Sequence, residues 1–293
     1  MKIRQFGIIV LMTMIILAGC NFKGEQPGDT KESSDKDPQR IISLMPSNTE
    51  ILYELGLGDA VIGVSTVDDY PKEVKDKMQF DAMNLDKEAL IKAQPDLILA
   101  HETQKASQGK VLESLEKSGI HVEYVKDAQS IHEMYDTFED IGQLTGKEKE
   151  ADALVKETQN HIKAVVEEIP QAQTKPSVFI EVSSEPEIYT VGNHTFLNDM
   201  LKQLKSKNVF SDVDNWPKVS KEQVIQKNPD VMISISGTSN KEYQKEVEGR
   251  SGFEVVNAVK NQRVVAVNDD LLSRPGPRLD DGLKKLRDAI YEK

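Results

Sequence analysis

Cysteine and tryptophan are almost absent from this chain of 293 residues, which contains one of each. The single cysteine, Cys20, excludes an internal disulfide bond, so the fold has to be held by a packed core. Aromatic residues make up only 5% of the sequence, although 38% of the residues are hydrophobic. A chain of this length and composition can bury more than one core. Beyond the first twenty residues, no apolar run is long enough to cross a membrane.

The sequence also lacks an excess of basic residues, and its formal net charge is −12 at pH 7. An acidic chain is repelled by nucleic acid and by acidic lipid surfaces. Catalytic motifs are missing as well: there is no glycine-rich phosphate loop, no G-x-S-x-G nucleophile elbow and no H-E-x-x-H motif. We therefore expect a protein that binds a small molecule without catalysis, cofactor or nucleic acid. An exported α/β hydrolase remains an alternative.

The five histidines are widely separated, at His101, His121, His132, His161 and His194. His101 and His194 are expected in loops after strands, where they could line a cleft. The other three fall in strand or helix patterns and are expected to be structural or exposed. No ligand spacing supports a metal site, so none is predicted. A zinc or manganese binding protein remains an alternative.

The N-terminus differs from the rest of the chain. A short basic region precedes an apolar run over 6–17, and Leu-Ala-Gly-Cys20 follows. This order is typical of a secretion signal, and Leu-Ala-Gly-Cys resembles the lipobox of bacterial lipoproteins, whose cysteine carries lipid after cleavage. We expect a signal peptide over 1–19 and a lipid anchor at Cys20 on the outer face of the cell membrane. Residues 20–39 are too polar to fold and are expected to form a tether.

Short strands and helices alternate along the remaining chain. This alternation predicts mainly parallel sheets flanked by helices. Ser47 with Glu50, and Ser130 with Glu133, have the spacing of a helix capping box, whereas 189–193 is expected to be a loop. The predicted strands are 40–44, 60–64, 97–100, 121–125, 177–182, 231–235 and 264–267. The predicted helices are 46–55, 72–78, 85–92, 111–117, 130–144, 146–170, 195–204, 219–227, 253–259 and 279–291.

The segment 146–170 has the pattern of one long helix. Its apolar residues recur at intervals of three and four, which gives a single buried stripe. Gly146 precedes the pattern and Pro170 ends it, because proline removes a backbone donor. At about 1.5 Å per residue, such a helix is roughly 35 Å long. We expect it to join an N-terminal lobe over 40–145 to a C-terminal lobe over 171–293, although it could also be a surface helix of one domain.

An internal repeat supports two similar lobes. Residues 85–99 align without a gap to 219–233, and the pairs Lys-Glu and Pro-Asp recur at matching positions. Helix, turn and buried strand is a common connection in α/β proteins, which could explain the pattern alone. We interpret the match as two related lobes with a cleft between them, because ligand sites favour interfaces between domains. The matched glutamates are Glu88 and Glu222.

Candidate ligand-binding residues lie after the predicted strands, where open α/β sheets place their ligands. Aromatic side chains there offer broad contact area at a small cost in entropy. A charged pair can orient amide or carboxylate groups of a ligand. In the first lobe the candidates are Tyr70, Phe80 and His101. In the second lobe they are Tyr189, Trp216, Asp270 and Arg274.

From about Arg40 onward, the chain resembles the helix-linked substrate-binding proteins of ABC importers, which take up vitamin B12, ferric siderophores or haem. The likeness is greatest to the cobalamin-binding members. It is carried by RIISLMPSNTE at 40–50, DYP at 69–71, MNL at 83–85, WPKVSKEQV at 216–224 and RPGPR at 274–278.

The resemblance implies two α/β lobes joined by one helix, and corrinoid contacts at Tyr189, Trp216, Asp270 and Arg274. Phe80 stands at a position where the family has tryptophan, and Val67 and His101 stand at further aromatic positions. These departures leave a ferric siderophore or haem as alternative ligands. The resemblance also implies that Glu88 and Glu222, one on each lobe, dock on a permease that works with an ATPase. The binding protein itself is expected to be a monomer.

Overall fold

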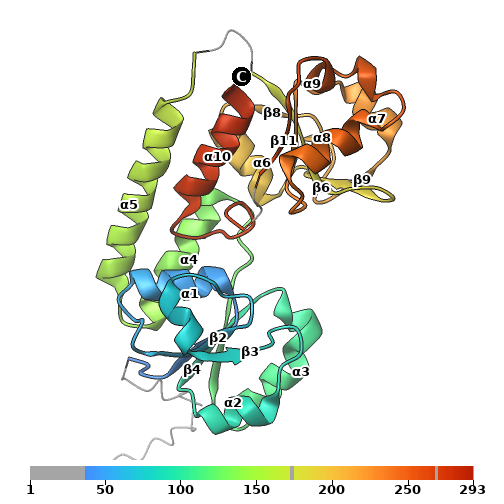
Figure 1. The fold of residues 1–293 in the computed structure, drawn as a ribbon. Helices are drawn as coiled ribbons and strands as arrows, with labels where there is room; N and C mark the ends of the chain where they lie inside the picture. The colour runs from blue at the N-terminus through green and yellow to red at the C-terminus, as the bar shows by residue number, and fades with distance from the viewer. Residues whose placement is uncertain (1–36, 172–174, 268–269, 293) are drawn as a thin grey trace, which may run out of the picture. The chain divides into compact units, whose positions relative to one another are not determined.

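The computed structural model describes residues 37–171, 175–267 and 270–292. The predicted signal peptide, the lipidation site at Cys20 and most of the predicted tether lie outside these ranges. Within them, no helix is both long and apolar enough to cross a membrane. The described chain builds two α/β lobes, each with its own sheet, as Figure 1 shows.

The first lobe contains a five-stranded sheet in the order β3-β2-β1-β4-β5, and all of its strand pairs are parallel. Its central strand IIS at Ile41–Ser43 is fully buried, as expected for a parallel strand covered on both faces. The strands are β1 (Ile41–Ser43), β2 (Val61–Ser65), β3 (Met78–Phe80), β4 (Leu97–His101) and β5 (His121–Val125). The helices are α1 (Pro46–Glu54), the 3-10 helix η1 (Lys72–Asp76), α2 (Lys87–Ala93), α3 (Gln104–Glu116) and α4 (Ile131–Leu144).

The second lobe contains a mixed sheet in the order β11-β10-β6-β7-β9, with β8 paired to β6. Strand β7 runs antiparallel to both neighbours, and the other pairs are parallel. The strands are β6 (Ser177–Ser183), β7 (Ile188–Thr190), β8 (Lys207–Asn208), β9 (Lys218–Val219), β10 (Val231–Ser234) and β11 (Val264–Ala266). The helices are α6 (Phe196–Gln203), α7 (Lys221–Lys227), α8 (Asn240–Glu248), η2 (Phe253–Val255), α9 (Asn257–Lys260) and α10 (Leu279–Tyr291).

The predicted long helix is present as α5 (Glu148–Glu167), between the two sheets in sequence. It packs against α4 and α10 (Figure 1). A Cβ atom added to Gly142 of α4 would lie 2.5 Å from the Cβ of Ala151, so this glycine allows the close approach of α4 and α5. One apolar core contains residues of both sheets and of α5. The buried side of α5 consists of the predicted stripe: Ala151, Leu154, Val155, Thr158, Ile162 and Val165.

The two copies of the internal repeat fold alike, as α2 with β4 and as α7 with β10. Each helix begins at a polar N-cap, Asp86 or Ser220, whose side chain accepts hydrogen bonds from the first turn. Each helix ends at a residue in the left-handed region, Gln94 at φ 51° or Asn228 at φ 46°. The repeated sequence therefore forms the same short helix in both lobes, with a polar N-cap and a left-handed C-cap.

The aspartate of each Pro-Asp turn accepts hydrogen bonds from a residue at the start of the neighbouring strand or just before it. The Asp230 carboxylate accepts hydrogen bonds from the N–H and hydroxyl groups of Ser177, at 3.0 and 2.7 Å. The Asp96 carboxylate accepts one from the N–H of Gln39, at 3.0 Å. These two aspartates thus have a structural role, which explains why Pro-Asp recurs in both lobes.

One of the two predicted capping boxes is wrong. Helix α1 has Met45 as its N-cap and Pro46 in its first turn, so Ser47 lies inside the helix and caps nothing. Glu50 is buried and is bonded to an arginine of the second lobe. At the start of α4, the N–H of Glu133 donates to the hydroxyl of Ser130 at 3.1 Å, which confirms the N-cap. The carboxylate of Glu133 accepts from the N–H of Gln129 at 2.7 Å and not from that of Ser130, so only half of the second box is confirmed.

Further differences include strand β3 of the first lobe, which was not predicted, and short elements of the second lobe. Tyr189 was expected in a loop but lies in the three-residue strand β7, which is too short to show an alternating pattern. The predicted helix 253–259 is divided into η2 and α9 by Val256, whose backbone is extended. Helix α8 was not predicted, because only Tyr243 and Val247 of its nine residues are buried.

Candidate functional site

Segment 270–278 of the second lobe meets the loop after β2 of the first lobe. Nη1 of Arg274 donates to Oδ1 of Asp69 at 2.5 Å, and Nη2 donates to the carbonyl of Val67 at 3.4 Å. Asp270 lies 3.8 Å from the same guanidinium. The side chain of Arg274 is only 16% exposed, whereas those of Asp69 and Asp270 are both 54% exposed. Two predicted site residues, Asp270 and Arg274, are thus brought together, and Asp69 joins them.

A second arginine connects the lobes beneath this surface. Nε and Nη2 of Arg278 donate to the two carboxylate oxygens of Glu50 at 2.8 and 2.6 Å. The guanidinium of Arg278 also lies 3.9 Å from the ring centroid of Tyr70, in cation–π contact. The hydrogen bonds to Glu50 raise the pKa of Arg278. Tyr70, a predicted ligand contact, is therefore oriented by Arg278, which is itself held by the buried Glu50.

The two predicted aromatic residues of the second lobe come from adjacent strand ends. Tyr189 in β7 lies opposite Lys218 in β9, and Trp216 stands two residues before Lys218. The N–H of Thr190 donates to the carbonyl of Pro217 at 3.1 Å, which extends the pairing towards Trp216. Tyr189 is 36% exposed and Trp216 is 45% exposed. Two large rings are therefore presented to solvent on one edge of the second sheet.

Phe80 does not join these exposed aromatic residues. It was expected in a loop, but it is the last residue of β3 and is only 7% exposed in the core of the first lobe. A Cβ atom added to Gly63 would lie 2.5 Å from the Phe80 ring, so the missing side chain of Gly63 leaves room for the ring. Phe80 is a core residue in this structure, and the prediction of an exposed stacking residue is corrected.

His101 ends strand β4, where a loop was expected, and its side chain is 12% exposed. Burial lowers its pKa, although nearby Asp127 acts in the opposite direction. One ring nitrogen, Nδ1, is bonded to the hydroxyl of Thr103 at 2.8 Å. His101 lines a small hollow together with Asn48 of α1 and Pro275 of the second lobe. It therefore lies near the contact between the lobes as a largely buried, neutral side chain.

Glu88 and Glu222 occupy matching, exposed positions in the first turns of α2 and α7. Hydrogen bonds from its own N–H and from Ser220 lower the pKa of Glu222. Neither glutamate caps its helix, because Asp86 and Ser220 already do so. The fold therefore explains the repeated aspartates and caps, but it does not explain the repeated glutamates.

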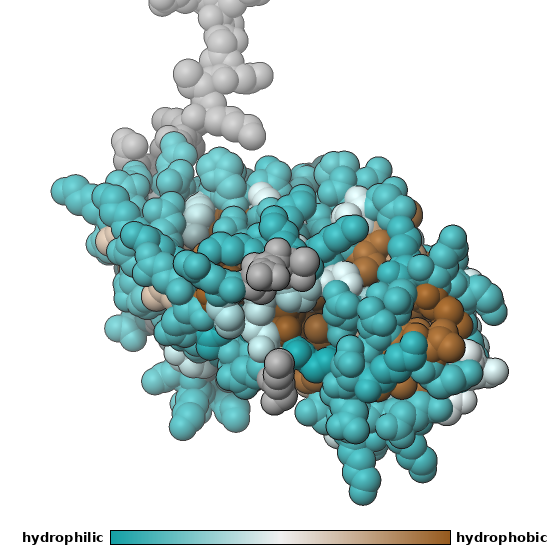
Figure 2. Space-filling model, turned by 90° about the horizontal axis from the view of Figure 1, so that it is seen from above, coloured by the Kyte–Doolittle hydropathy of each residue, from teal (hydrophilic) through white to brown (hydrophobic). Residues whose placement is uncertain are grey.

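The remaining exposed apolar surface is limited. In the view of Figure 2 most residues are hydrophilic, and the hydrophobic ones gather in a few separate patches. Large exposed apolar side chains occur in the loops after β2 and β3, at Val67 and Met83, as well as at the predicted aromatic sites. Val67 is 63% exposed and Met83 is 76% exposed. Met83 was not singled out as a site residue, although it begins one of the family-like motifs.

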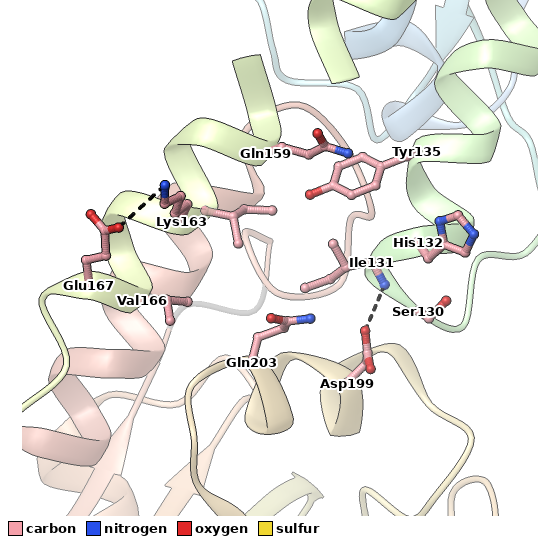
Figure 3. Close-up of a pocket in the computed structure, with 11 residues that line it drawn as sticks. Ser130, Ile131, His132, Tyr135, Gln159, Lys163, Val166, Glu167, Asp199 and Gln203 are labelled. Atoms are coloured by element: carbon pink, nitrogen blue, oxygen red, sulfur yellow. Dashed lines mark hydrogen bonds and ion pairs between the residues drawn. The ribbon is translucent and has the colours of Figure 1, made fainter. Parts of the chain in front are cut away.

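A different hollow, of about 660 Å³, lies between α4, α5 and α6 (Figure 3). Its polar side chains are partly engaged: Asp199 accepts from the N–H of Ile131 at 3.0 Å, and Lys163 pairs with Glu167 at 3.7 Å. Burial raises the pKa of Tyr135, which also lines it, to about 12. This hollow shares no residue with the predicted site. Among the described residues, no cluster of three or more potential metal ligands occurs.

Sequence reasoning missed Glu50 and Arg278 as parts of the site. Both lie within the motifs that carry the family resemblance, at 40–50 and 274–278, but a motif does not reveal which residues pair. They are 228 positions apart in the sequence.

Comparison with known proteins agrees with this architecture. A family model described as periplasmic binding protein matches residues 41–271. The uncharacterized ABC transporter substrate-binding lipoprotein YvrC of Bacillus subtilis (strain 168) is 40% identical over an alignment of 306 positions, gaps included, which covers 96% of this chain and 95% of that relative. The vitamin B12-binding protein of Yersinia pestis (strain Pestoides F) is 30% identical over 244 residues, which cover 82% of each chain.

Solved structures of periplasmic binding proteins also resemble this chain in fold. A protein of Staphylococcus epidermidis ATCC 12228, described as a possible iron-binding (periplasmic solute-binding) protein, has a TM-score of 0.85 and 59% identity, covering 88% of this chain and 100% of that one. The periplasmic vitamin B12 binding protein BtuF of Vibrio cholerae has a TM-score of 0.67 and 25% identity, covering 87% and 97%. The chain therefore belongs to the periplasmic binding protein family, as the substrate-binding component of an ABC transporter and not an enzyme.

Proposed function

We propose that the protein captures a corrinoid and delivers it to an ABC importer. The observation that carries this proposal is the exposed aromatic pair Tyr189 and Trp216 on one edge of the second sheet. Flat rings of this kind stack on the broad apolar face of a macrocycle. Similarity to vitamin B12-binding proteins, at 30% identity over most of the chain, supports the same ligand class.

Polar groups of the ligand would be held at the contact between the lobes. Arg274 supplies several N–H donors, and Asp270 supplies an acceptor, so together they can bind the amide groups at the edge of a corrin ring. Tyr70, held against Arg278, adds an aromatic contact from the first lobe. His101 and Phe80 lie too deep for direct stacking, so in this proposal they support the walls of the site.

A ferric chelate is the second candidate ligand. It is favoured by the similarity, at 59% identity, to the Staphylococcus epidermidis protein described as possibly iron-binding. Replacement of the family's aromatic residues by Val67 and His101 also leaves a different ring surface on the first lobe. A compact siderophore complex needs less flat surface than a corrin does.

The remaining parts of the proposal concern location and docking. Cys20 would carry the lipid anchor after removal of residues 1–19, and 20–39 would tether the folded lobes to the outer face of the membrane. The relative from Bacillus subtilis is named a lipoprotein, which supports this arrangement. The lobes would extend over 40–145 and 171–293, with 146–170 as their link. Glu88 and Glu222 would bind basic residues of the permease.

Calorimetric titration of the purified full chain with cyanocobalamin tests the ligand. A binder should release or absorb heat and should gain thermal stability, by about 2.7 kcal/mol when the ligand is at a hundred times its Kd. Tighter binding of a ferric siderophore in the same assay would favour the second candidate. Absence of both heat and stabilisation with corrinoid, siderophore and haem would refute the proposed function.

A further inference from the structure

The two arginines at the contact between the lobes are outnumbered by carboxylates. Arg274 and Arg278 face Glu50, Asp69 and Asp270, with nitrogen–oxygen distances from 2.5 to 3.9 Å. Three acidic groups therefore surround two basic ones. The side chains of Arg274 and Arg278 are only 16% and 27% exposed, so water screens their charges weakly. The three neighbouring carboxylates compensate these charges within the protein.

Basic side chains next to the aromatic pair are compensated as well. Nζ of Lys218, the residue opposite Tyr189, donates to Glu187 at 2.5 Å. Lys221, at the start of α7, is paired with Glu185. The buried ring of His101 adds no positive charge at neutral pH, because burial lowers its pKa. Arg274, Arg278, Lys218 and Lys221 therefore each have an acidic partner.

A ligand carboxylate that approaches Arg274 meets Asp69, the nearest partner of this guanidinium, and also Asp270 and Glu50. Like charges in such proximity repel one another. A neutral carbonyl group does not meet this obstacle. The guanidinium has five N–H groups, so besides its contacts to Asp69 and to the Val67 carbonyl it can donate to an amide oxygen.

We infer that the site selects its ligand by charge, accepting neutral or cationic metal chelates and rejecting anionic ones. The inference rests on the proposed function, since it concerns the same site. Neutral cyanocobalamin, neutral ferrichrome and cationic ferrioxamine B fulfil this rule. Haem with ionised propionates and anionic ferric enterobactin do not.

These five chelates, titrated separately into the full chain at one ionic strength, test the rule. The tightest ligand should be neutral or cationic and should bind at least about tenfold more tightly than either anionic chelate. In Asp69→Asn, the ratio of the affinity for the anionic chelates to the affinity for the neutral ones should rise by about tenfold. Asp152→Asn on the exposed side of α5 changes the net charge equally and should leave all affinities unaltered.

Two results would overturn the inference in different ways. An anionic chelate as the tightest ligand, with no response to Asp69→Asn, would overturn the charge rule, while a protein that binds a metal chelate for an ABC importer would still be supported. Failure of every chelate to bind would overturn the proposed function and the charge rule together. Equal gains of anion affinity in Asp69→Asn and Asp152→Asn would show a general effect of net charge and would also overturn the rule.

Discussion

Glu50 and Arg278 form a two-pronged ion pair that joins helix α1 of the first lobe to the start of α10 in the second. The carboxylate is almost fully buried, with 4% of the side chain exposed, whereas Arg278 is 27% exposed. Bidentate geometry is among the stronger arrangements of a charged hydrogen bond. This pair therefore fixes the lobes to each other at the point where the proposed ligand site begins.

Replacement Arg278→Met should destabilise the protein by about 2–3 kcal/mol, because it leaves a buried carboxylate without its partner. The value is set below that of a fully buried pair, since Arg278 is partly exposed and Arg274 lies 3.9 Å from Glu50. Urea unfolding at neutral pH measures the change. Lys284→Met removes the pairs of a half-exposed lysine with Asp280 and Asp281 on the same helix, and should cost less than about 1 kcal/mol. Equal losses in both variants would contradict the role of burial.

Replacement Asp230→Asn tests the turn that both repeats share. Burial alone would raise the pKa of Asp230, but hydrogen bonds from the Ser177 hydroxyl and N–H outweigh it and hold the pKa below its ordinary value of 3.8. The stabilisation is therefore fully present above pH 3.8 and is lost as the pH falls through the lower, folded-state pKa. The variant should be about 1 kcal/mol less stable at pH 7, and the difference should shrink below pH 3.8.

The matched variant is Asp96→Asn at the equivalent turn of the first lobe. Asp96 accepts from the N–H of Gln39 at an exposed position, so its replacement should cost less than about 0.5 kcal/mol. Unfolding curves recorded from pH 7 down to pH 3 compare the two variants. A pH-independent loss in Asp230→Asn would mean that the ionised form of the carboxylate is not what stabilises this turn.

Gly192 controls the position of the segment that carries Trp216. A Cβ atom at this glycine would lie 2.4 Å from the carbonyl oxygen of Val213 and 2.7 Å from that of Asn215. Backbone atoms cannot give way cheaply, so Gly192→Ala should cost about 1–3 kcal/mol and should weaken corrinoid binding. Gly109→Ala in helix α3 meets open space and should instead stabilise the protein by roughly 0.5–1 kcal/mol. Unchanged affinity in Gly192→Ala would argue against Trp216 as a ligand contact.

The parts of the fold that were predicted from sequence are those with a local signal. The buried stripe of α5 and the repeated helix, turn and strand were visible because their side-chain patterns repeat within a few residues. The mixed character of the second sheet was not visible, because β7 and β9 contain only three and two residues. Short strands depend on their neighbours rather than on their own pattern.

The candidate site was predicted less completely, for reasons of distance and packing. Arg274 and Asp270 could be named from the sequence, but their partner Asp69 lies 205 positions from Arg274. Phe80 was misplaced because its burial depends on the space above Gly63 in the adjacent strand. These contacts form only when the sheets assemble, so they cannot be predicted from the local pattern of a single sequence.

The repeated glutamates give the last prediction. In the double variant Glu88→Lys and Glu222→Lys, uptake of labelled cyanocobalamin should be abolished in cells that lack the original gene, while the affinity of the purified chain stays within about twofold. The expected cause is repulsion from basic residues of the permease. Each lysine also opposes a helix dipole at a cost of about 0.3–1 kcal/mol, so a control must carry the same cost. Glu148→Lys, in the exposed first turn of α5, carries the cost of one such lysine, is the control for each single variant and should leave uptake normal.

The outcomes separate docking from its alternatives because both glutamates are exposed and neither caps its helix. Normal uptake in the double variant would place the permease contact elsewhere. Loss of ligand affinity would mean that the glutamates belong to the ligand site. Loss of uptake in Glu148→Lys would point to a fold weakened by any helix-start lysine. Single variants add a further criterion: because one glutamate lies on each lobe, either replacement alone should reduce uptake, and the double variant should reduce it further.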